Sequence, residues 1–562
     1  MARRRRNPVN RRIRLLLAFL LVGFAILLGR AVWLQGVQAG SLSELAAKQH
    51  RAVVVLPASR GTIFDRTGLQ LAIGEQATTV YADPRQVRDA RVVATAAART
   101  LEVNADDLYR ELADKKRNFV YVKRKADPAK AALLEKRGLA GLGFYPEERR
   151  FYPQGSVASH LLGYAGLDNR GLAGLELQLD KTIAGKPGSE RRVIDALGHV
   201  LDVVDQRPAV DGRNVRLTID HTIQANAEAV LRQTISKWGA KGATAVVLDP
   251  RNGEVLAMAS APGFDANAFG STPPAATRNR AVTDVYEPGS TFKLVTVAGV
   301  LSDRLVQPQT TFTLPYSIQV ADRVIHDAEQ RGTETMSVAR ILAQSSNVGA
   351  ITLAEKLGPK RLYRWMRRFG FGSFTGIGFP GESPGFVLKP DEWSGSTIGN
   401  VPIGQGVAVT PVQMAAAYAT IANHGVWVQP HLVARVQGGK RVRPHTRRVL
   451  RPAIAAELNA MLQNVVREGT GTLAKVDGYK VAGKTGTAQK PDSHGGYSGG
   501  HYVASFVGMV PASRPRFVVS IMVDEPHGAI WGGVVAAPAF AQIAAYDLQY
   551  LEVPPDNINA RG

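Results

Sequence analysis

An apolar run near the N-terminus constrains what this chain can form more than any other feature. The run LLLAFLLVGFAILLG covers residues 15–29, and arginines precede it at positions 3–6, 11, 12 and 14. A helix that crosses a membrane needs about 20 apolar residues. Residues 13–34 reach that length if Arg14 and Arg30 extend their charged groups to the membrane surfaces, with Trp33 at one surface. We therefore predict a membrane-spanning helix at residues 13–34.

The distribution of charge around this segment predicts its orientation. Basic residues concentrate before it and are few directly after it. Residues 1–12 are therefore expected to be a short cytoplasmic tail, and the rest of the chain to lie outside the plasma (inner) membrane. The alternative is a signal peptide cleaved at the small-residue stretch Val37-Gln38-Ala39. The apolar run ends well before Ala39, which favours an uncleaved, single-pass anchor.

Length, charge and cysteine content limit the class of protein. The chain has 562 residues. A single hydrophobic core does not extend through a chain of this length, so two or more domains are expected. Its net charge of +22 fits nucleic-acid binding, attraction to an anionic membrane or cell envelope, or solubility alone. The basic residues are spread along the chain without zinc-finger spacing or a Walker loop, which disfavours nucleic acid as a partner. The absence of cysteine excludes disulfides, thiol catalysis and cysteine-bound zinc.

Strand and helix patterns predict an α+β domain in the C-terminal part. Residues 243–260 have the pattern of two strands joined at Asn252-Gly253, a strong hairpin signal. Further strands are predicted at 480–489, 502–510 and 516–524, with long helical stretches between the two groups. Strands from both ends would then join one sheet. A polar segment at 205–214 marks a boundary, which predicts one domain at 35–213, a second at 214–552 and a C-terminal tail at 553–562.

The stretch YEPGSTFK, residues 286–293, contains a candidate nucleophile. Pro288 and Gly289 interrupt the chain and an amphipathic helical pattern follows, so Ser290 is expected in the first helical turn with Lys293 on the same face. A helix N-terminus stabilises negative charge, and a lysine with a lowered pKa can take the hydroxyl proton. The simpler interpretation is a capping serine beside a surface lysine. The S-x-x-K spacing alone favours that simpler interpretation, because it is common.

A second motif, Ser345-Ser346-Asn347, follows an apolar helical stretch. Ser345 offers a hydroxyl that can relay protons. Asn347 can orient Lys293 and a substrate amide, and Ser346 is predicted to contact substrate. The motif would therefore supply Lys293 with a proton-relaying hydroxyl and an orienting amide.

A third motif, Lys484-Thr485-Gly486-Thr487, lies on the strand predicted at 480–489. Lys484 supplies a positive charge for a substrate carboxylate, Thr485 and Thr487 supply hydroxyls, and Gly486 lets a substrate backbone approach the strand edge. The order S-x-x-K, S-x-N, K-T-G is the set shared by penicillin-binding proteins and β-lactamases. Each motif alone is a weak signal, whereas the three in this order make Ser290 the predicted nucleophile and Lys293 its base.

Beyond these motifs the sequence resembles the class B penicillin-binding proteins, which are peptidoglycan D,D-transpeptidases. RGTIFDRTGLQLA resembles the N-terminal signature of that family, and RFYPQGSVASHLLGYAG and GLAGLELQLDKTIAGKPG resemble its pedestal motifs. NRAVTDVYEPGSTFK and GQGVAVTPVQMAAAYATIANHG resemble its transpeptidase domain. The resemblance covers residues 50–550. Asp284 and Glu287 resemble the division-specific, FtsI-like type more than the elongation type, which tends to have proline at the position of Glu287.

The resemblance implies an architecture and a set of partners. The fold class would be α+β, a penicillin-binding/β-lactamase-like transpeptidase domain with an antiparallel sheet and helices on both faces. A transmembrane helix and an elongated, non-catalytic pedestal would precede it. The expected partners are an FtsW-type glycosyltransferase and other divisome membrane proteins. No metal or cofactor is expected.

The resemblance also implies a reaction. Ser290 would attack the D-Ala-D-Ala carbonyl of a stem peptide during septal cell-wall synthesis, and β-lactam antibiotics would acylate the same serine. The backbone N–H groups of Ser290 and Thr487 would form the oxyanion hole. No E-x-x-L-N stretch stands between the second and third motifs to supply the deacylating glutamate of class A β-lactamases. A long-lived penicilloyl-enzyme is therefore expected.

Other functions are open on the same fold. An elongation-type class B protein is one, and a D,D-carboxypeptidase or β-lactamase-like serine hydrolase is another. A β-lactam sensor or an inactive scaffold would be non-enzymatic. Residues 1–14 are too short for a cytoplasmic signalling domain, and the complete set of motifs argues against an inactive scaffold.

Overall fold

The protein divides into two compact units. The structure, a computed structural model, describes residues 8–38, 40, 51–194, 200–491, 496–497 and 499–556. One unit is Met1–Ala58 with Lys186–Asp211, and the other is Ser59–Gly185 with Gly212–Gly562. Most of the predicted cytoplasmic tail, the end of the predicted C-terminal tail and Ala39 of the alternative cleavage site lie outside the described residues.

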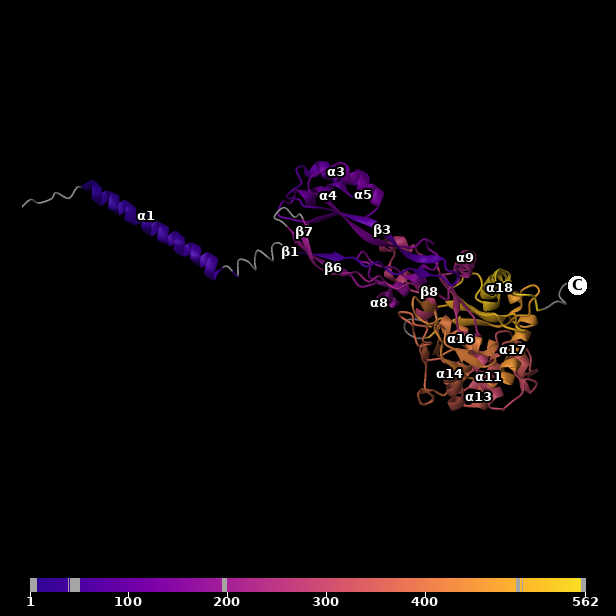
Figure 1. Cartoon of the computed structure of the whole chain (residues 1–562). Helices are drawn as coiled ribbons and strands as arrows, with labels where there is room; N and C mark the ends of the chain where they lie inside the picture. Colours follow the sequence, from indigo (N-terminus) through magenta and orange to yellow (C-terminus); the bar gives the residue numbers. More distant parts are fainter. Residues whose placement is uncertain are drawn as a thin grey trace, which may run out of the picture. The chain divides into compact units, whose positions relative to one another are not determined.

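The first unit contains the predicted anchor and a small sheet. Helix α1 (Pro8–Val32) continues into the π-helical segment η1 (Trp33–Val37), as the long indigo helix of Figure 1 shows. The stretch Arg11–Val37 is long and apolar enough to cross a membrane, with a mean hydropathy of 2.5. The helix predicted at 13–34 is therefore present. The small sheet has the antiparallel order β1-β6-β7, formed by β1 (Arg51–Leu56), β6 (Gly188–Ile194) and β7 (Val200–Arg207).

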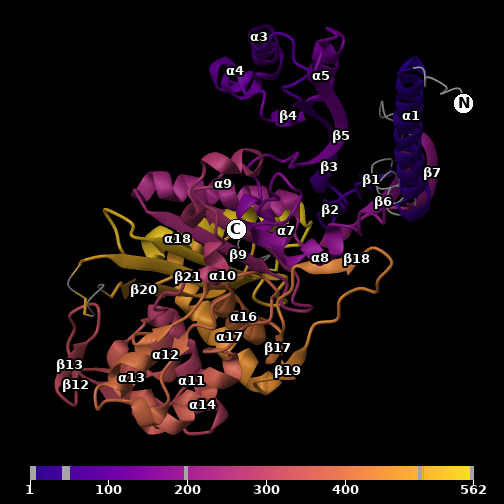
Figure 2. The same ribbon diagram turned by 90° about the vertical axis from the view of Figure 1, so that its left-hand side faces the viewer.

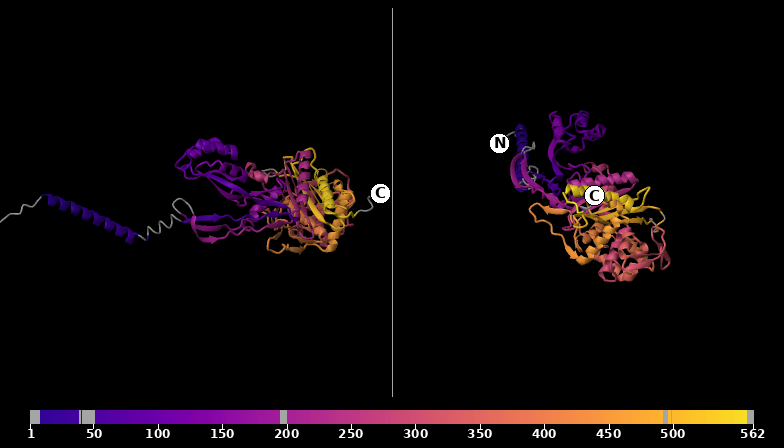
Figure 3. Two further views of the ribbon diagram at one scale, coloured as in Figure 1. Left: turned by 45° about the horizontal axis from the view of Figure 1, so that its top comes forward. Right: turned by 90° about the vertical axis from the view of Figure 1, so that its right-hand side faces the viewer.

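The second unit begins with a long strand pair that carries three helices. Strand β3 (Gln70–Ala82) pairs with β5 (Leu142–Phe151) and, near its end, with β4 (Val120–Ala126). The helices lie beside the end of these strands, as the purple ribbons of Figures 2 and 3 show. They pack around a small apolar core. They are α3 (Ala90–Leu101), α4 (Ala105–Ala113) and α5 (Pro128–Glu135).

Strand pairing joins this region to the C-terminal part of the chain. The short strand β2 (Ile63–Phe64) pairs with β8 (Val215–Leu217), which in turn pairs with β18 (Val433–Val436). Residues 59–185 therefore share a compact unit with residues 212–562, whereas the predicted domain 35–213 places them with the anchor-proximal residues. The predicted boundaries themselves remain predictions. Three short helices follow β5: α6 (Ser159–Leu162), α7 (Gly174–Gln178) and α8 (Asp180–Ile183).

A five-stranded antiparallel sheet forms the centre of the C-terminal part. Its order is β10-β9-β22-β21-β20, so strands from residues 242–261 join strands from residues 482–524. The sequence predicted this union and the hairpin at Asn252-Gly253. The strands are β9 (Gly242–Leu248), β10 (Val255–Ala261), β20 (Ala482–Gln489), β21 (Tyr502–Val510) and β22 (Phe517–Asp524).

Helices cover both faces of this sheet because successive strand residues point to opposite sides. Val246 and Leu248 join one core, while Ala245 and Val247 join the other. Figure 1 shows α9 (His221–Trp238) and α18 (Gly532–Tyr550) on one face. On the other face lie α11 (Lys293–Ser302), α16 (Pro411–Ala422) and α17 (Pro452–Arg467). The predicted fold class is confirmed.

The segments between the two groups of strands supply the remaining elements. Helices here are η2 (Ala266–Ser271), η3 (Pro274–Ala276), α10 (Arg280–Thr283), η4 (Gly289–Phe292), α12 (Val338–Ala343), α13 (Asn347–Leu357), α14 (Pro359–Phe369), η5 (Pro390–Glu392), α15 (Thr397–Asn400), η6 (Val401–Ile403) and η7 (Thr472–Ala474). Short strands are β11 (Thr311–Leu314), β12 (Ser317–Val320), β13 (Arg323–His326), β14 (Glu334–Ser337), β15 (Phe386–Val387), β16 (Val407–Ala408), β17 (Val426–Val428) and β19 (Thr446–Arg448).

Candidate active site

Ser290 lies on a tight turn that packs against the edge strand β20. The turn is the 3₁₀-helix η4, and α11 begins directly after it at Lys293. Gly289 has a φ of 54°, and a Cβ atom there would lie 2.7 Å from the carbonyl oxygen of Thr487. Glycine is therefore required for the turn to approach the strand this closely. Ser290 itself is half-buried.

Lys293 lies beneath this turn and binds the second motif. Its Nζ donates to the carbonyl oxygen of Ser345 at 2.5 Å, to Ser345 Oγ at 3.2 Å and to Asn347 Oδ1 at 2.7 Å. Lys293 is only 1% exposed, and this burial lowers its pKa to about 7, although the charge of Asp327 acts in the opposite direction. A substantial fraction of the lysine is therefore neutral near pH 7, as a general base requires.

The second motif turns sharply into a helix. Ser345 has a φ of 59°, and α13 begins at Asn347 with Ser346 as its N-cap. Ser346 is buried, and its hydroxyl accepts from the N–H of Gly349 at 2.9 Å and donates to Asp327. Its predicted contact with substrate stays a prediction, because in this structure the hydroxyl already has two protein partners.

The third motif lies on β20, whose outer edge is free of strand partners within the described sheet. Lys484 is fully buried, and Nζ donates to the carbonyl oxygen and Oγ1 of Thr485 at 3.2 and 3.3 Å. Burial and then the charge of Lys293 lower the pKa of Lys484 well below its usual value. Thr485 Oγ1 also lies 2.7 Å from Thr470 Oγ1, and Thr487 Oγ1 accepts from the N–H of Gly532 at 3.1 Å.

The turn η4 carries the predicted nucleophile Ser290 and is called the nucleophile turn below. It lies against β20 at the predicted oxyanion donors. These donors are the N–H groups of Ser290 and Thr487, and Gly289 and Gly486 are the residues at which the two segments touch. A Cβ atom at Gly486 would lie 2.8 Å from the carbonyl oxygen of Pro288. Gly486 thus lets the protein's own turn approach the strand. The approach of a substrate, which the sequence predicted for it, remains a prediction.

A cavity of about 410 Å³ lies beside the end of β20. Glu287 lines it and accepts from the N–H of Gly406 at 2.8 Å and from the hydroxyl of Tyr497 at 3.0 Å. Burial raises the pKa of Glu287. Asp284 pairs with Arg280 at 2.8 Å, which also pairs with Asp524. The two acidic residues that pointed to the division-specific type are therefore built into the wall next to the nucleophile turn.

Sequence reasoning missed several residues that hold the site together. Tyr418 donates its hydroxyl to the carbonyl oxygen of Thr291 at 2.9 Å, and Gly404 accepts from the N–H of Gly289 at 3.1 Å. Thr470 bonds Thr485, and Asp327 caps the helix that carries Asn347. None of these residues lies in a short motif with chemistry of its own. Within the described residues, no three His, Asp or Glu side chains are grouped to hold a metal ion.

Comparison with known proteins identifies the family. Residues 243–545 match the penicillin binding protein transpeptidase domain, and residues 55–217 match the penicillin-binding protein dimerisation domain. The chain belongs to the penicillin-binding proteins. Together the two matches place this penicillin-binding protein in class B, as its sequence motifs predicted.

Relatives of this penicillin-binding protein match over almost its whole length. The penicillin-binding protein PbpB of Mycolicibacterium smegmatis is 36% identical, over 93% of this chain and 87% of the relative. The peptidoglycan D,D-transpeptidase FtsI of Escherichia coli K12 is 34% identical, over 98% and 93%. Stage V sporulation protein D of Bacillus subtilis is 33% identical, over 97% and 87%. The crystal structure of penicillin binding protein 3 from Mycobacterium tuberculosis, complexed with aztreonam, has a TM-score of 0.71 at 33% identity, over 89% of this chain and 98% of that one.

Proposed function

We propose that this penicillin-binding protein is a peptidoglycan D,D-transpeptidase that cross-links stem peptides through an acyl-enzyme on Ser290. The observation that carries the proposal is the buried Lys293, with a pKa of about 7, held by the second motif directly beneath the nucleophile turn. A lysine of ordinary pKa would be fully charged and unable to accept a proton. The names of the FtsI relatives support the same reaction.

The chemistry proceeds in two transfers. Neutral Lys293 takes the hydroxyl proton as Ser290 Oγ bonds to the carbonyl carbon of the penultimate D-Ala, and the terminal D-Ala leaves as an amine after gaining a proton. The amine of a neighbouring stem peptide then attacks the ester, gives up a proton and releases Ser290. Ser345 relays these protons, since its hydroxyl lies 3.2 Å from Lys293 Nζ.

Binding groups surround the acyl group on the β20 side. The N–H groups of Ser290 and Thr487 stabilise the developing oxyanion. Lys484 attracts the terminal carboxylate of the donor, and the hydroxyls of Thr485 and Thr487 bond it. Asn347 and the backbone beside Gly486 hold the stem peptide against the free edge of the strand. In a β-lactam complex the same groups would hold the ring carboxylate and carbonyl.

The anchor and the family support a proposal about the cellular role. The arginine-rich N-terminus remains in the cytoplasm and the catalytic part lies outside the membrane. Asp284 and Glu287 support the division-specific role, in which the protein works with an FtsW-type glycosyltransferase and other divisome membrane proteins. A fluorescent fusion should localise to midcell; a uniform sidewall pattern would instead support the elongation-type role.

The nucleophile assignment is tested by Ser290→Ala in the full-length protein. This variant should lose all covalent labelling by a fluorescent penicillin, because the acyl-accepting oxygen is gone. Ser271→Ala, on the exposed segment η2, should label as the unaltered protein does. Intact-protein mass spectrometry measures the adduct. A remaining penicilloyl adduct on Ser290→Ala would show that another residue is the nucleophile.

A further inference from the structure

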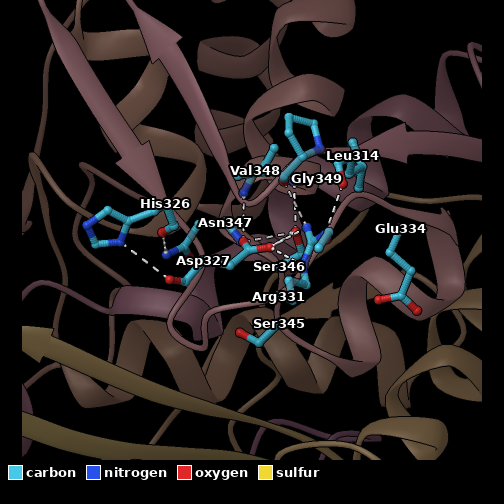
Figure 4. Close-up of polar contacts among 12 residues, drawn as sticks. Leu314, His326, Asp327, Arg331, Glu334, Ser345, Ser346, Asn347, Val348 and Gly349 are labelled. Carbon is cyan, nitrogen blue, oxygen red and sulfur yellow. Dashed lines mark hydrogen bonds and ion pairs between the residues drawn. The ribbon is translucent and has the colours of Figure 1, made fainter.

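One buried carboxylate outside the three motifs binds the start of helix α13. Asp327 follows β13 and is 6% exposed. Its Oδ1 accepts from the backbone N–H groups of Asn347 at 2.6 Å and of Val348 at 3.0 Å, and Ser346 Oγ lies 3.0 Å from it (Figure 4). A carboxylate in this position satisfies N–H groups that a helix start otherwise leaves unpaired, and it interacts favourably with the helix dipole.

The carboxylate is itself fixed by an arginine. Arg331 donates to Asp327 Oδ2 from Nε at 2.9 Å and from Nη2 at 2.6 Å. The other guanidinium N–H groups donate to the backbone carbonyls of Leu314 and Gly332 at 2.9 Å and of Pro315 at 3.1 Å. A bidentate pair of this kind fixes the orientation of the carboxylate as well as its position. Asp327 is therefore immobilised against the loops that follow β11 and β13.

One of the residues that Asp327 holds, Asn347, also binds Lys293. Asn347, whose backbone N–H binds Asp327, binds Lys293 through Oδ1, and its Nδ2 donates to the carbonyl oxygen of His326 at 3.0 Å. Ser345, directly before this helix start, gives Lys293 its two other acceptors. The segment 326–331 thus positions the second motif, and the second motif positions the amine of Lys293.

We propose that Asp327, fixed by Arg331, is a positioning residue of the catalytic centre, which holds Ser345 and Asn347 in place and supplies the negative charge that balances Lys293. This inference rests on the proposed function. It assigns a role in acylation to a residue that touches neither substrate nor nucleophile. Its action is transmitted through the backbone of Asn347 and through the electrostatic field at Lys293.

The electrostatic part of the role has a defined sign. Three ionisable groups face the buried site from the elements packed around it: Asp327, Arg331, which pairs with it at 2.6 Å, and Lys484 on β20, whose own pKa the charge of Lys293 lowers. Burial lowers the pKa of Lys293, and Asp327 raises it. Removing the carboxylate charge leaves the effect of burial unopposed, so the pKa of Lys293 should fall further. The pH below which acylation declines would then move downward.

The test compares three variants of the full-length protein. Asp327→Asn removes the charge but keeps the shape, Asp327→Glu keeps the charge but displaces it, and Glu334→Gln is the matched control. Glu334 lies on β14 of the same region, pairs with Arg340 at 2.5 Å and stands apart from the network in Figure 4. Second-order acylation rate constants with a fluorescent penicillin, measured from pH 5 to pH 9, are the readout.

Asp327→Asn should acylate about 10- to 100-fold more slowly at pH 8, because small displacements in a catalytic centre have effects of this size. The pH below which its acylation rate declines (its acidic limb) should also be lower than in the unaltered protein. Asp327→Glu should be slowed but keep its limb near pH 7, and Glu334→Gln should change neither quantity. If Asp327→Asn acylates more slowly but its rate declines at the same pH as in the unaltered protein, Asp327 has only a structural role and the electrostatic part of the proposal is overturned. An unchanged acylation rate would overturn the whole proposal.

Two outcomes separate this inference from the proposed function. If the unaltered protein does not label, the proposed function fails. If it labels and Asp327→Asn labels equally fast with the same limb, only the role of Asp327 fails. Should Asp327→Asn not fold, Asp327→Glu decides: a normal acylation rate in that variant contradicts the requirement for position.

Discussion

Two buried lysines lie close together in the candidate active site, and their surroundings favour different proposed roles. Lys293 has three close acceptors from the second motif, whereas Lys484 has two longer contacts, both to Thr485. Lys293, the first residue of α11, is thus fixed by three acceptors, which suits the proposed proton transfer. Lys484 retains capacity to bond a substrate carboxylate on the strand.

The rate of acylation should depend on pH through Lys293. Because the base acts in its neutral form and its pKa is about 7, acylation by a fluorescent penicillin should fall about tenfold per pH unit below 7 and level off above it. Stopped-flow or quenched labelling from pH 5 to pH 9 measures this limb, and thermal melts over the same range provide the control for folding. A limb near pH 10, typical of an exposed lysine, would contradict the assignment.

The three motifs could be predicted at the residue scale because each carries its chemistry in a few adjacent positions. Ser290 and Lys293 are separated by one helical turn, and the sequence alone predicts that they share a face. Asp327 could not be found in this way. Its role comes from packing against Asn347, which is distant in sequence, and a single aspartate after a short strand carries no local signal.

At the scale of elements, the nucleophile turn depends on β20. The positive φ of Gly289 and its close approach to Thr487 leave no room for a side chain. The sequence predicted that Ser290 lies in the first turn of a helix. The structure has a 3₁₀ turn that precedes the α-helix. That geometry results from contact with a strand far along the chain, which local propensity does not report.

Gly289→Ala should therefore impair acylation with a limited effect on the fold. An alanine at this φ costs about 1 kcal/mol, and the Cβ atom would displace the turn from β20. Acylation should slow about 10- to 100-fold. Gly270→Ala, where a Cβ atom has open space on η2, is the matched control and should acylate normally. Equal acylation rates for the two variants would show that acylation does not depend on the close approach of the turn to β20.

The strands of the central sheet could be predicted well from the sequence. The segments at 502–510, 516–524 and 480–489 correspond to β21, β22 and β20 with ends within about two residues. The first two are mainly apolar runs bounded by turn residues, a pattern that marks buried strands. The boundary predicted between residues 213 and 214 remains a prediction. The pairing of β2 with β8 joins distant segments, and no single window of sequence contains both partners.

At the scale of the whole molecule, a buried ion cluster ties three distant segments together. Glu176 is fully buried and pairs with Arg60 and Arg150, both at 2.6 Å. Arg60 also pairs with Asp180 at 2.7 Å. Two N–H-bearing nitrogens of Arg150, Nη1 and Nη2, are buried without a partner among the described residues. The carboxylate of Glu176 is thus the main compensation for two buried guanidinium groups.

Glu176→Gln should strongly destabilise the protein. Removing one member of a buried ion cluster leaves uncompensated charge, which costs about 3–5 kcal/mol. Thermal melting followed by circular dichroism measures the loss. Glu75→Gln is the matched control, because Glu75 pairs with Arg149 at 2.6 Å on the partly exposed surface of β3 and β5, where such pairs contribute about 0–1 kcal/mol. Similar melting temperatures for the two variants would contradict the expectation that the buried ion cluster contributes more to stability than the partly exposed pair.

The order of strands in the central sheet also sets when the active site can exist. Val247 on β9 pairs with Val519 on β22, and β20 reaches the sheet only through β21. Ser290, Lys293 and Asn347 are synthesised long before Lys484 and Thr487. Contacts this distant in sequence form late in folding. An incomplete chain has Ser290 but lacks β20 beside it, so we expect covalent binding of penicillin to report that the central sheet is complete.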